Sequence, residues 1–357
     1  MGSWAPQLAL VQKRLSADLG LFGLALTSMA VGAIIAMPLT GALIGRRGSA
    51  GLLAWVSPLM FASFLLPVLA PNLGVLALAL AVFGATNGAM DVAMNAHGLA
   101  VEGAVRRPVM SGLHALWSLG GFLGAGLGSL ALALLQPWQH AALVGVLMTA
   151  LSLYACRFLL PGAADRGPAA AHFAMPTPAT IGLGLLCFIA LMGEGAVLDW
   201  AAIHLRDTYH VADDVAGLAY AVFAGTMAAT RFGGDGLRAR FGAVALVRVS
   251  AGVTLLGMLG AILAPSALVC IFGYGLAGFG IGNLAPVLFA GGGRREADNP
   301  ARGIAAVTTL GYAGFIAGPP LIGMLARGAG LPLALGVIVL GMAVIALAAP
   351  MAASADG

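Results

Sequence analysis

Stretches of about 20 apolar residues recur along the whole chain, and this repetition limits the possible folds more than any other feature. They lie at 21–45, 50–70, 73–98, 110–135, 140–160, 179–205, 215–237, 242–264, 266–290, 302–326 and 332–350. About 20 apolar residues are what an α-helix needs to cross the hydrocarbon core of a bilayer. With 61% apolar and only 8% charged side chains, the chain also lacks the polar surface of a water-soluble protein. We therefore predict an all-α, polytopic membrane protein with about eleven transmembrane helices.

Basic residues at the ends of these stretches predict the orientation. One side holds Arg46, Arg47, Arg106, Arg107, Arg157, Arg166, Arg238, Arg240, Arg294, Arg295 and Arg302. The other side holds Lys13, Arg14, Arg206 and Arg327. The arginine-rich side is cytoplasmic by the positive-inside rule, which also places the C-terminus there. The composition, rich in Ala, Gly and Arg, is typical of a GC-rich bacterial gene.

Three landmarks recur at one offset of 194 residues, which predicts a duplicated half. Arg46 and Gly48 match Arg240 and Gly242, Gly84 and Gly88 match Gly278 and Gly282, and Gly120 and Gly124 match Gly314 and Gly318. A copy that keeps its orientation gives two parallel, pseudo-symmetric helical bundles. We assign these bundles to residues 1–160 and 179–357. The Pro-, Ala- and Gly-rich residues 161–178 form a cytoplasmic linker between them.

The first bundle is expected to be short of one helix. The second bundle begins with a full helix whose outer end carries Leu198-Asp199-Trp200-Ala201, and Gly2-Ser3-Trp4-Ala5-Pro6 is similar to that outer end. Because the chain starts at Met1, the residues that precede Asp199 in its helix have no counterpart in the first bundle. We therefore expect eleven helices, that is, twelve minus most of the first. Two explanations remain open: a start codon placed too far downstream or a trimmed gene, and a natural eleven-helix variant.

Two loops contain similar strings, Gly41-Ala-Leu-Ile-Gly45-Arg46-Arg47-Gly48 and Gly234-Asp235-Gly-Leu237-Arg-Ala-Arg240-Phe-Gly242. They resemble a signature of the major facilitator superfamily of secondary transporters. The resemblance implies two six-helix halves with a gate at each loop. The acid of the first signature is replaced by Gly45, which puts the gate at Gly41, Arg46 and Gly48 in doubt. The second loop keeps Asp235, and its gate also includes Arg240. Arg231 lies four residues before Asp235, and this spacing predicts an ion pair between them that acts as a latch near the cytoplasmic end.

Four further strings lie within the apolar stretches. They are Asp91-Val-Ala-Met-Asn95-Ala-His97, Gly193-Glu194-Gly195-Ala-Val-Leu-Asp199-Trp200, Gly280-Ile-Gly-Asn283-Leu-Ala-Pro286 and Gly311-Tyr312-Ala-Gly314-Phe-Ile-Ala-Gly318-Pro319. They resemble a narrower branch, little-characterised bacterial inner-membrane permeases similar to fucose and other sugar permeases. This resemblance implies a bacterial inner-membrane location and transport of a small polar solute such as a sugar.

Glu194 is the first candidate for a transport role. Ionisable groups in hydrocarbon cost about 2.5–3.5 kcal/mol each, so those that persist usually face a bundle interior or a wet cavity. Glu194 stands well inside its predicted helix between two glycines that can loosen the backbone. It can load and release a proton, or it can only fix the packing of a neighbouring helix. Asp199 and Trp200 lie further out, where they meet a substrate hydroxyl or end the helix in the interface.

Other polar residues at helical spacing add candidates. Asn87, Asp91 and Asn95 share one helix face, where they line a cavity suited to a polyol or join helices as polar contacts. His114 is a titrating group or a structural bundle histidine. Asn283 indicates a locally irregular helix beside the pathway, or close glycine packing. Tyr312 offers a hydroxyl contact.

Several function classes are excluded. The cysteines Cys156, Cys187 and Cys270 lack metal or disulfide spacing, and no HExxH, GxSxG or paired carboxylate indicates an enzyme or a metal site. The scattered arginines do not form a nucleic-acid patch. We predict a monomeric secondary transporter that works by alternating access, with proton-coupled uptake and no cofactor besides the proton gradient. The alternatives are proton-antiport efflux of drugs or metabolites, and a channel or transport-dead structural or sensor protein.

Overall fold

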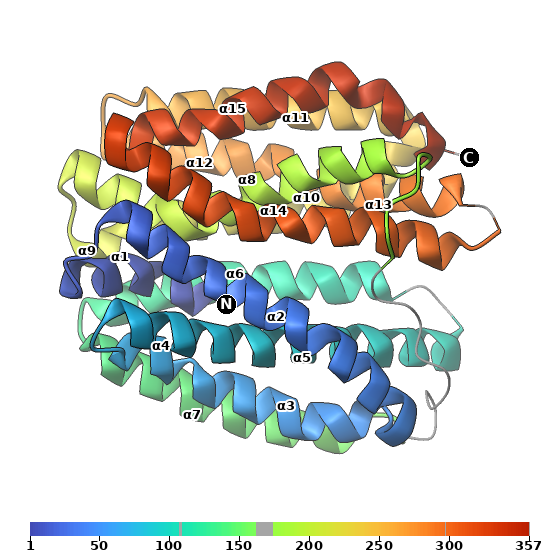
Figure 1. Ribbon diagram of the computed structural model, residues 1–357, viewed down its shortest axis with the longest axis horizontal. Helices are drawn as coiled ribbons and strands as arrows, with labels where there is room; N and C mark the ends of the chain where they lie inside the picture. The colour runs from blue at the N-terminus through green and yellow to red at the C-terminus, as the bar shows by residue number, and fades with distance from the viewer. Residues whose placement is uncertain (107–108, 162–173, 297, 357) are drawn as a thin grey trace. The chain divides into compact units, whose positions relative to one another are not determined.

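The computed structural model describes residues 1–106, 109–161, 174–296 and 298–356, apart from the side chains of Ser111, Asp235 and Ala301. Throughout these residues the regular structure is helical (Figure 1). The elements are η1 (Gly2–Trp4), α1 (Ala5–Arg14), α2 (Leu19–Arg47), α3 (Ser49–Ser63), α4 (Leu65–Leu69), α5 (Leu73–Val105), α6 (Met110–Leu132), α7 (Pro137–Ala155), η2 (Cys156–Phe158), α8 (Ile181–Tyr209), α9 (Asp213–Ala216), α10 (Leu218–Phe241), α11 (Ala243–Ile262), α12 (Ala267–Ile281), α13 (Leu284–Arg295), α14 (Pro300–Ala329), α15 (Leu331–Ala348) and η3 (Ala349–Ala355).

Among the described residues, 11 helical stretches are long and apolar enough to cross a membrane, which confirms the expected number. Most predicted boundaries fall within a few residues of the observed ones. The largest difference is at α5, which was expected to end at residue 98 and continues to Val105. Helix α1 has ten residues, about 15 Å at 1.5 Å per residue, and is too short to cross the bilayer.

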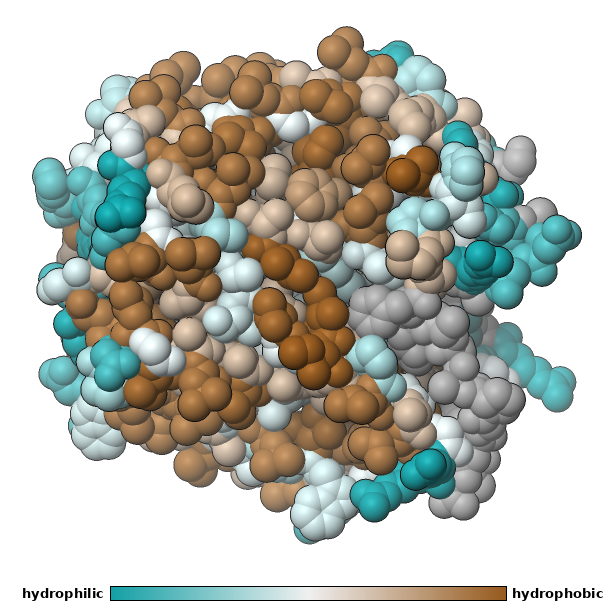
Figure 2. Space-filling model, viewed as in Figure 1, coloured by the Kyte–Doolittle hydropathy of each residue, from teal (hydrophilic) through white to brown (hydrophobic). Residues whose placement is uncertain are grey.

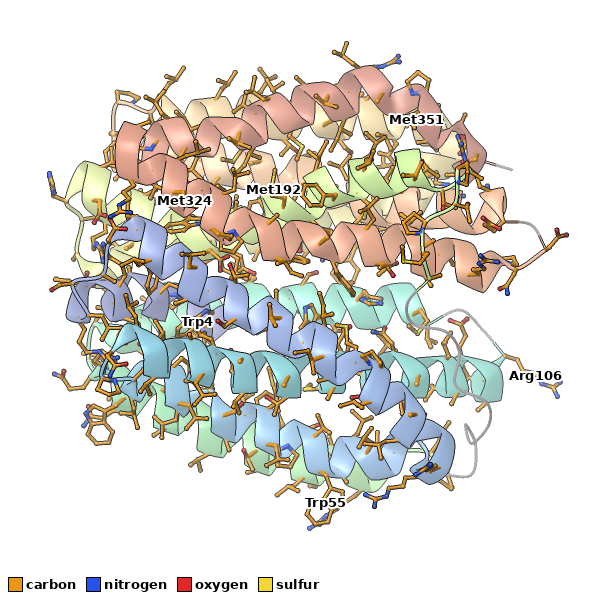
Figure 3. The ribbon with its side chains drawn as sticks, in the orientation of Figure 1. Trp4, Trp55, Arg106, Met192, Met324 and Met351 are labelled. Carbon is orange, nitrogen blue, oxygen red and sulfur yellow. The ribbon has the colours of Figure 1, made fainter. Side chains whose placement is uncertain are left out.

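Large apolar side chains are exposed along these helices. In α15, Leu340 is 70% exposed and Leu347 is 82% exposed, and in α7 Val146 is 72% exposed. Trp55 of α3, also 72% exposed, points away from its helix in Figure 3. Hydrophobic side chains cover the lengths of the helices on the face drawn in Figure 2, and hydrophilic ones gather near the helix ends. This distribution suits helices that lie against lipid.

The chain forms two compact units. Unit 1 comprises residues 1–24, 115–133 and 173–357, and unit 2 comprises residues 25–114 and 134–172. Their limits differ from the predicted bundles 1–160 and 179–357, whose division stays a prediction. Most of the predicted linker 161–178 lies outside the described residues.

The predicted repeat is visible in how glycines pack within each unit. In unit 2, a Cβ on Gly84 of α5 would lie 1.9 Å from the carbonyl oxygen of Met29 on α2. In unit 1, a Cβ on Gly278 of α12 would lie 2.1 Å from the carbonyl oxygen of Phe223 on α10. Met29 and Phe223 are themselves 194 residues apart. Each pair of helices therefore touches backbone to backbone at the same point of the repeat.

Helix starts repeat in the same way. Asn72 caps α5 by accepting from the backbone N–H of Val75, and Ser266 caps α12 by accepting from that of Val269. Gly48 and Gly242, which directly precede α3 and α11, both have φ of 78°, a region that favours glycine. The third landmark differs, since a Cβ on Gly120 would meet nothing within 4 Å whereas one on Gly314 would lie 2.3 Å from the carbonyl oxygen of Phe188.

One span is interrupted near its middle. Helix α12 ends at Ile281 and α13 begins at Leu284, with Gly282 and Asn283 between them. This confirms the irregular helix that Asn283 predicted. The break exposes main-chain groups inside the span, and these need partners in a setting without water.

Candidate functional site

Glu194 and Arg231 form an ion pair inside unit 1. The Oε2 atom of Glu194 on α8 lies 3.2 Å from Nη2 of Arg231 on α10. The two side chains are 21% and 18% exposed. Glu194 lies about 20 Å along α8 from Ile181 at 1.5 Å per residue, so the pair is well inside the span. Such a pair in hydrocarbon is a functional candidate because each charge alone is costly there.

Arg231 has two further partners in unit 1. Its Nη1 donates to Oγ of Ser118 on α6 at 2.8 Å, and its Nε donates to the carbonyl oxygen of Gly282 at 3.2 Å. The carbonyl of Gly282 is available because α12 ends at Ile281. Arg231 therefore joins the carboxylate of Glu194, a buried hydroxyl and the broken helix.

The predicted partner of Arg231 was Asp235. The side chain of Asp235 is outside those that the structure describes, and Glu194 is the acid that pairs with Arg231. Arg231 was also expected near the cytoplasmic end of its helix. Because α10 continues to Phe241, Arg231 lies about 15 Å inside that end at 1.5 Å per residue. The latch between Arg231 and Asp235 stays a prediction.

The glycines beside Glu194 allow close packing. A Cβ on Gly195 would lie 2.6 Å from the ring of Phe315 on α14, and one on Gly193 would lie 3.1 Å from Met342 on α15. Helix α8 runs unbroken through both positions. Met192, labelled in Figure 3, contacts α14 in the same way, since a Cβ on Gly314 would lie 2.9 Å from its main-chain nitrogen.

Asn283 brings an unsatisfied polar group close to the ion pair. It is 4% exposed, and a Cβ on Gly234 of α10 would lie 2.3 Å from its Oδ1. Its Nδ2 is buried and has no hydrogen-bond partner among the described residues. A buried amide without a partner is costly, so this group is a donor available to a ligand or a water molecule.

Asp199 and Trp200 follow on α8. Asp199 is half-buried, and its carboxylate has no hydrogen-bond or ion-pair partner in the described part of the chain. Trp200 is fully buried and packs edge-to-face against Phe22, with ring centroids 6.4 Å apart. Helix α8 continues to Tyr209, so the reading in which these residues end the helix in the interface is wrong. Trp200 belongs to the packed interior of unit 1.

Tyr312 is half-buried on α14, with its ring centroid 6.2 Å from that of Phe315. Nearby, the hydroxyl of Thr309 donates to the carbonyl oxygen of Ala305 at 2.7 Å. The role of Tyr312 in solute binding stays a prediction.

Unit 2 contains the polar stripe of α5. Nδ2 of Asn95 donates to the carbonyl oxygen of Asp91 at 2.9 Å and to its Oδ1 at 3.2 Å, so these side chains share a face as predicted. Asn87, one turn earlier, has a buried Oδ1 with no partner among the described residues. His114 of α6 is exposed. The stripe therefore combines a satisfied pair with one open acceptor.

The remaining gate residues lie at helix ends. In unit 2, Gly41 is buried, Arg46 is exposed and Gly48 has the positive φ that separates α2 from α3. In unit 1, Arg240 is exposed, with its guanidinium carbon 5.2 Å from the ring centroid of Phe241. Their role in gating stays a prediction.

A profile of the Major Facilitator Superfamily matches residues 1–290. The chain belongs to this superfamily. An uncharacterised superfamily transporter of Yersinia pestis is 35% identical over 352 residues, which cover 98% of this chain and 91% of that protein. The predicted resemblance and the all-α membrane fold are thereby confirmed.

Solved structures of superfamily members share the fold. The nucleoside transporter NupG matches with a TM-score of 0.71 and 13% identity, over 98% of this chain and 95% of NupG. The E. coli fucose:proton symporter FucP matches with a TM-score of 0.60 and 16% identity, over 98% and 97% of the two chains. The relatives are transporters, and the chain is a multi-pass membrane protein of that kind.

Proposed function

We propose that this superfamily member is a secondary active transporter that takes up a small polar solute, such as a sugar, together with protons. It works by alternating access, with residues 1–160 and 179–357 as the bundles that move. The Glu194–Arg231 pair carries the proposal, because it is a titratable acid balanced by a base within a span.

Proton binding at Glu194 changes what Arg231 can do. A protonated Glu194 has lost its negative charge, so the guanidinium of Arg231 is left without a counter-ion and its donors turn to other acceptors. A solute that offers hydroxyl oxygens to these donors stabilises the protonated state. Solute and proton then bind together, and each favours the other by the same factor. When the proton leaves on the cytoplasmic side, the ion pair reforms and displaces the solute.

The open polar groups support a hydroxylated solute. In unit 1 these groups are Nδ2 of Asn283, a buried donor, and the half-buried carboxylate of Asp199, an acceptor. Unit 2, considered by itself, has Oδ1 of Asn87 as a buried acceptor. A sugar hydroxyl both donates and accepts, so it can satisfy groups of either kind. FucP, a fucose:proton symporter, and NupG, a nucleoside transporter, share the fold, and fucose and nucleosides are both rich in hydroxyl groups.

The remaining features of the proposal are the expectations stated in the sequence analysis. The protein acts as a monomer in a bacterial inner membrane, with its linker and C-terminus on the cytoplasmic side, where arginines are concentrated. The proton gradient drives transport and no cofactor takes part.

The test is uptake of a labelled panel of sugars and nucleosides into proteoliposomes with an imposed proton gradient. We expect accumulation of at least one solute, with protons moving in the same direction. Glu194→Gln abolishes accumulation against a gradient, whereas Glu296→Gln retains it. Glu296 is the matched control because it lies outside the membrane core and accepts from Thr177 at 2.6 Å. Protons moving opposite to the solute would identify efflux by antiport, and absence of any transport would overturn the proposal.

A further inference from the structure

Arg248 is an exposed arginine in the spanning helix α11. Within the described part of the chain it makes one hydrogen bond, from Nε to the carbonyl oxygen of Ala346 on α15, at 3.4 Å. Among the described residues no acidic side chain pairs with it. The guanidinium has five N–H donors, so most of them have no partner in the protein.

The surroundings of Arg248 are apolar and exposed. On α11, Val249 is 63% exposed and Leu256 is 61% exposed, while on the adjoining α15 Leu340 is 70% exposed and Leu347 is 82% exposed. Such a surface on spanning helices is covered by lipid chains. An arginine in this surface extends its charged head to the nearest polar layer.

Arg248 is close enough to that layer. It lies about 7.5 Å along α11 from Ala243 at 1.5 Å per residue. Ala346 is in the last turn of α15, which ends at Ala348, so the hydrogen bond directs the guanidinium toward the helix ends. These ends lie on the arginine-rich side, which the sequence predicts to be cytoplasmic.

We propose that Arg248 and the apolar surface of α11 and α15 bind an anionic phospholipid of the cytoplasmic leaflet. The phosphate accepts from the free guanidinium donors, for which its geometry is suited, and the acyl chains cover Val249 and Leu347. A zwitterionic lipid also has a phosphate but adds an ammonium group, which the guanidinium repels. Arg327 provides the contrast, because this exposed arginine has an acid of the protein, Asp18, at 3.2 Å.

The test is thermal unfolding of the purified full-length protein in detergent with added phosphatidylglycerol or phosphatidylcholine. We expect phosphatidylglycerol to raise the melting temperature more than phosphatidylcholine does. Arg248→Gln requires about fivefold more phosphatidylglycerol for the same rise, the factor expected for one basic residue at an anionic surface. Arg248→Lys keeps the positive charge but loses the paired N–H donors of the guanidinium. The amount of phosphatidylglycerol that it requires is expected to lie between those of the wild type and Arg248→Gln.

Arg248→Gln also breaks the hydrogen bond to Ala346, which can lower the melting temperature in either lipid. Comparing the two lipids within each variant removes this effect. Arg327→Gln is the matched control and keeps the wild-type preference for phosphatidylglycerol. The proposal is overturned if the wild type shows no such preference, if Arg248→Gln retains it in full, or if Arg327→Gln weakens it as much. The last result would indicate only a general response to positive charge.

Discussion

Arg231 on α10 holds the carboxylate of Glu194 on α8 at 3.2 Å and also donates to Ser118 on α6 at 2.8 Å. With its bond to the carbonyl oxygen of Gly282, this guanidinium connects four spans of unit 1: α6, α8, α10 and the interrupted α12–α13. Removing one charge of such a pair strands the other in a poorly solvated place, which costs more than removing both.

This asymmetry predicts the behaviour of charge-removal variants. Arg231→Gln leaves the Glu194 carboxylate unbalanced and is expected to lower the free energy of unfolding by about 1–3 kcal/mol. The double variant Glu194→Gln with Arg231→Gln recovers part of that loss. Melting temperatures of the single and double variants in one detergent measure the difference. Strictly additive losses would show that the two groups do not interact.

Two serines of α6 provide a matched pair. Ser118 is 2% exposed and accepts from Arg231, whereas Ser129 is 1% exposed and its hydroxyl has no partner among the described residues. Ser118→Ala is expected to cost about 1 kcal/mol through the lost hydrogen bond. Ser129→Ala is expected to be neutral or stabilising, because it removes an unpaired buried hydroxyl. Equal losses in the two melting temperatures would contradict the contact with Arg231.

The repeated glycine contacts predict where a methyl group is not tolerated. Gly84→Ala and Gly278→Ala place a Cβ about 2 Å from a carbonyl oxygen of the neighbouring helix, where backbone must move. We expect each to cost about 1–3 kcal/mol. Gly252→Ala in α11 is the control, since its Cβ would meet nothing within 4 Å. It is expected to be neutral or to stabilise by up to about 1 kcal/mol. Thermal unfolding of the three variants decides this, and similar losses in all three would refute the packing argument.

Periodicity and arginine placement predicted the spans because the membrane imposes one length and one polarity on every helix. The repeat was also visible, since Gly84 and Gly278 must both be small for helices to touch. The end of α5 was missed because Glu102 follows the apolar stretch, and the helix continues through it to Val105.

Local spacing could not reveal the partner of Arg231. It suggested Asp235 because these residues are four apart, whereas Glu194 is 37 residues away in the chain and reaches Arg231 through helix packing. The contact with Gly282 depends on the interrupted helix, of which the sequence showed only the glycines and Asn283. Arg231 lies six residues inside the end of the apolar stretch 215–237, and this position was the available indication that it needed an intramembrane partner.

Asn87 tests the open acceptor of unit 2. Because its Oδ1 has no partner among the described residues, Asn87→Ala should leave the melting temperature nearly unchanged. If the solute donates to this oxygen, its affinity falls about tenfold, the loss expected for one good hydrogen bond. Asn95→Ala is the control, since it breaks the contacts with Asp91 and lowers stability. The measurement is equilibrium binding of a solute identified in the uptake panel. An unchanged affinity in Asn87→Ala would show that Asn87 does not contact the solute.

Proton movement during solute uptake tests the role of Glu194 most directly. Proteoliposomes that contain the wild type and a pH-sensitive dye inside are given the transported solute without any imposed gradient. The account predicts acidification of the interior with the wild type and with Glu296→Gln. With Glu194→Gln it predicts solute entry down its gradient without acidification. Acidification by Glu194→Gln at the wild-type ratio of protons to solute would show that Glu194 does not carry the proton.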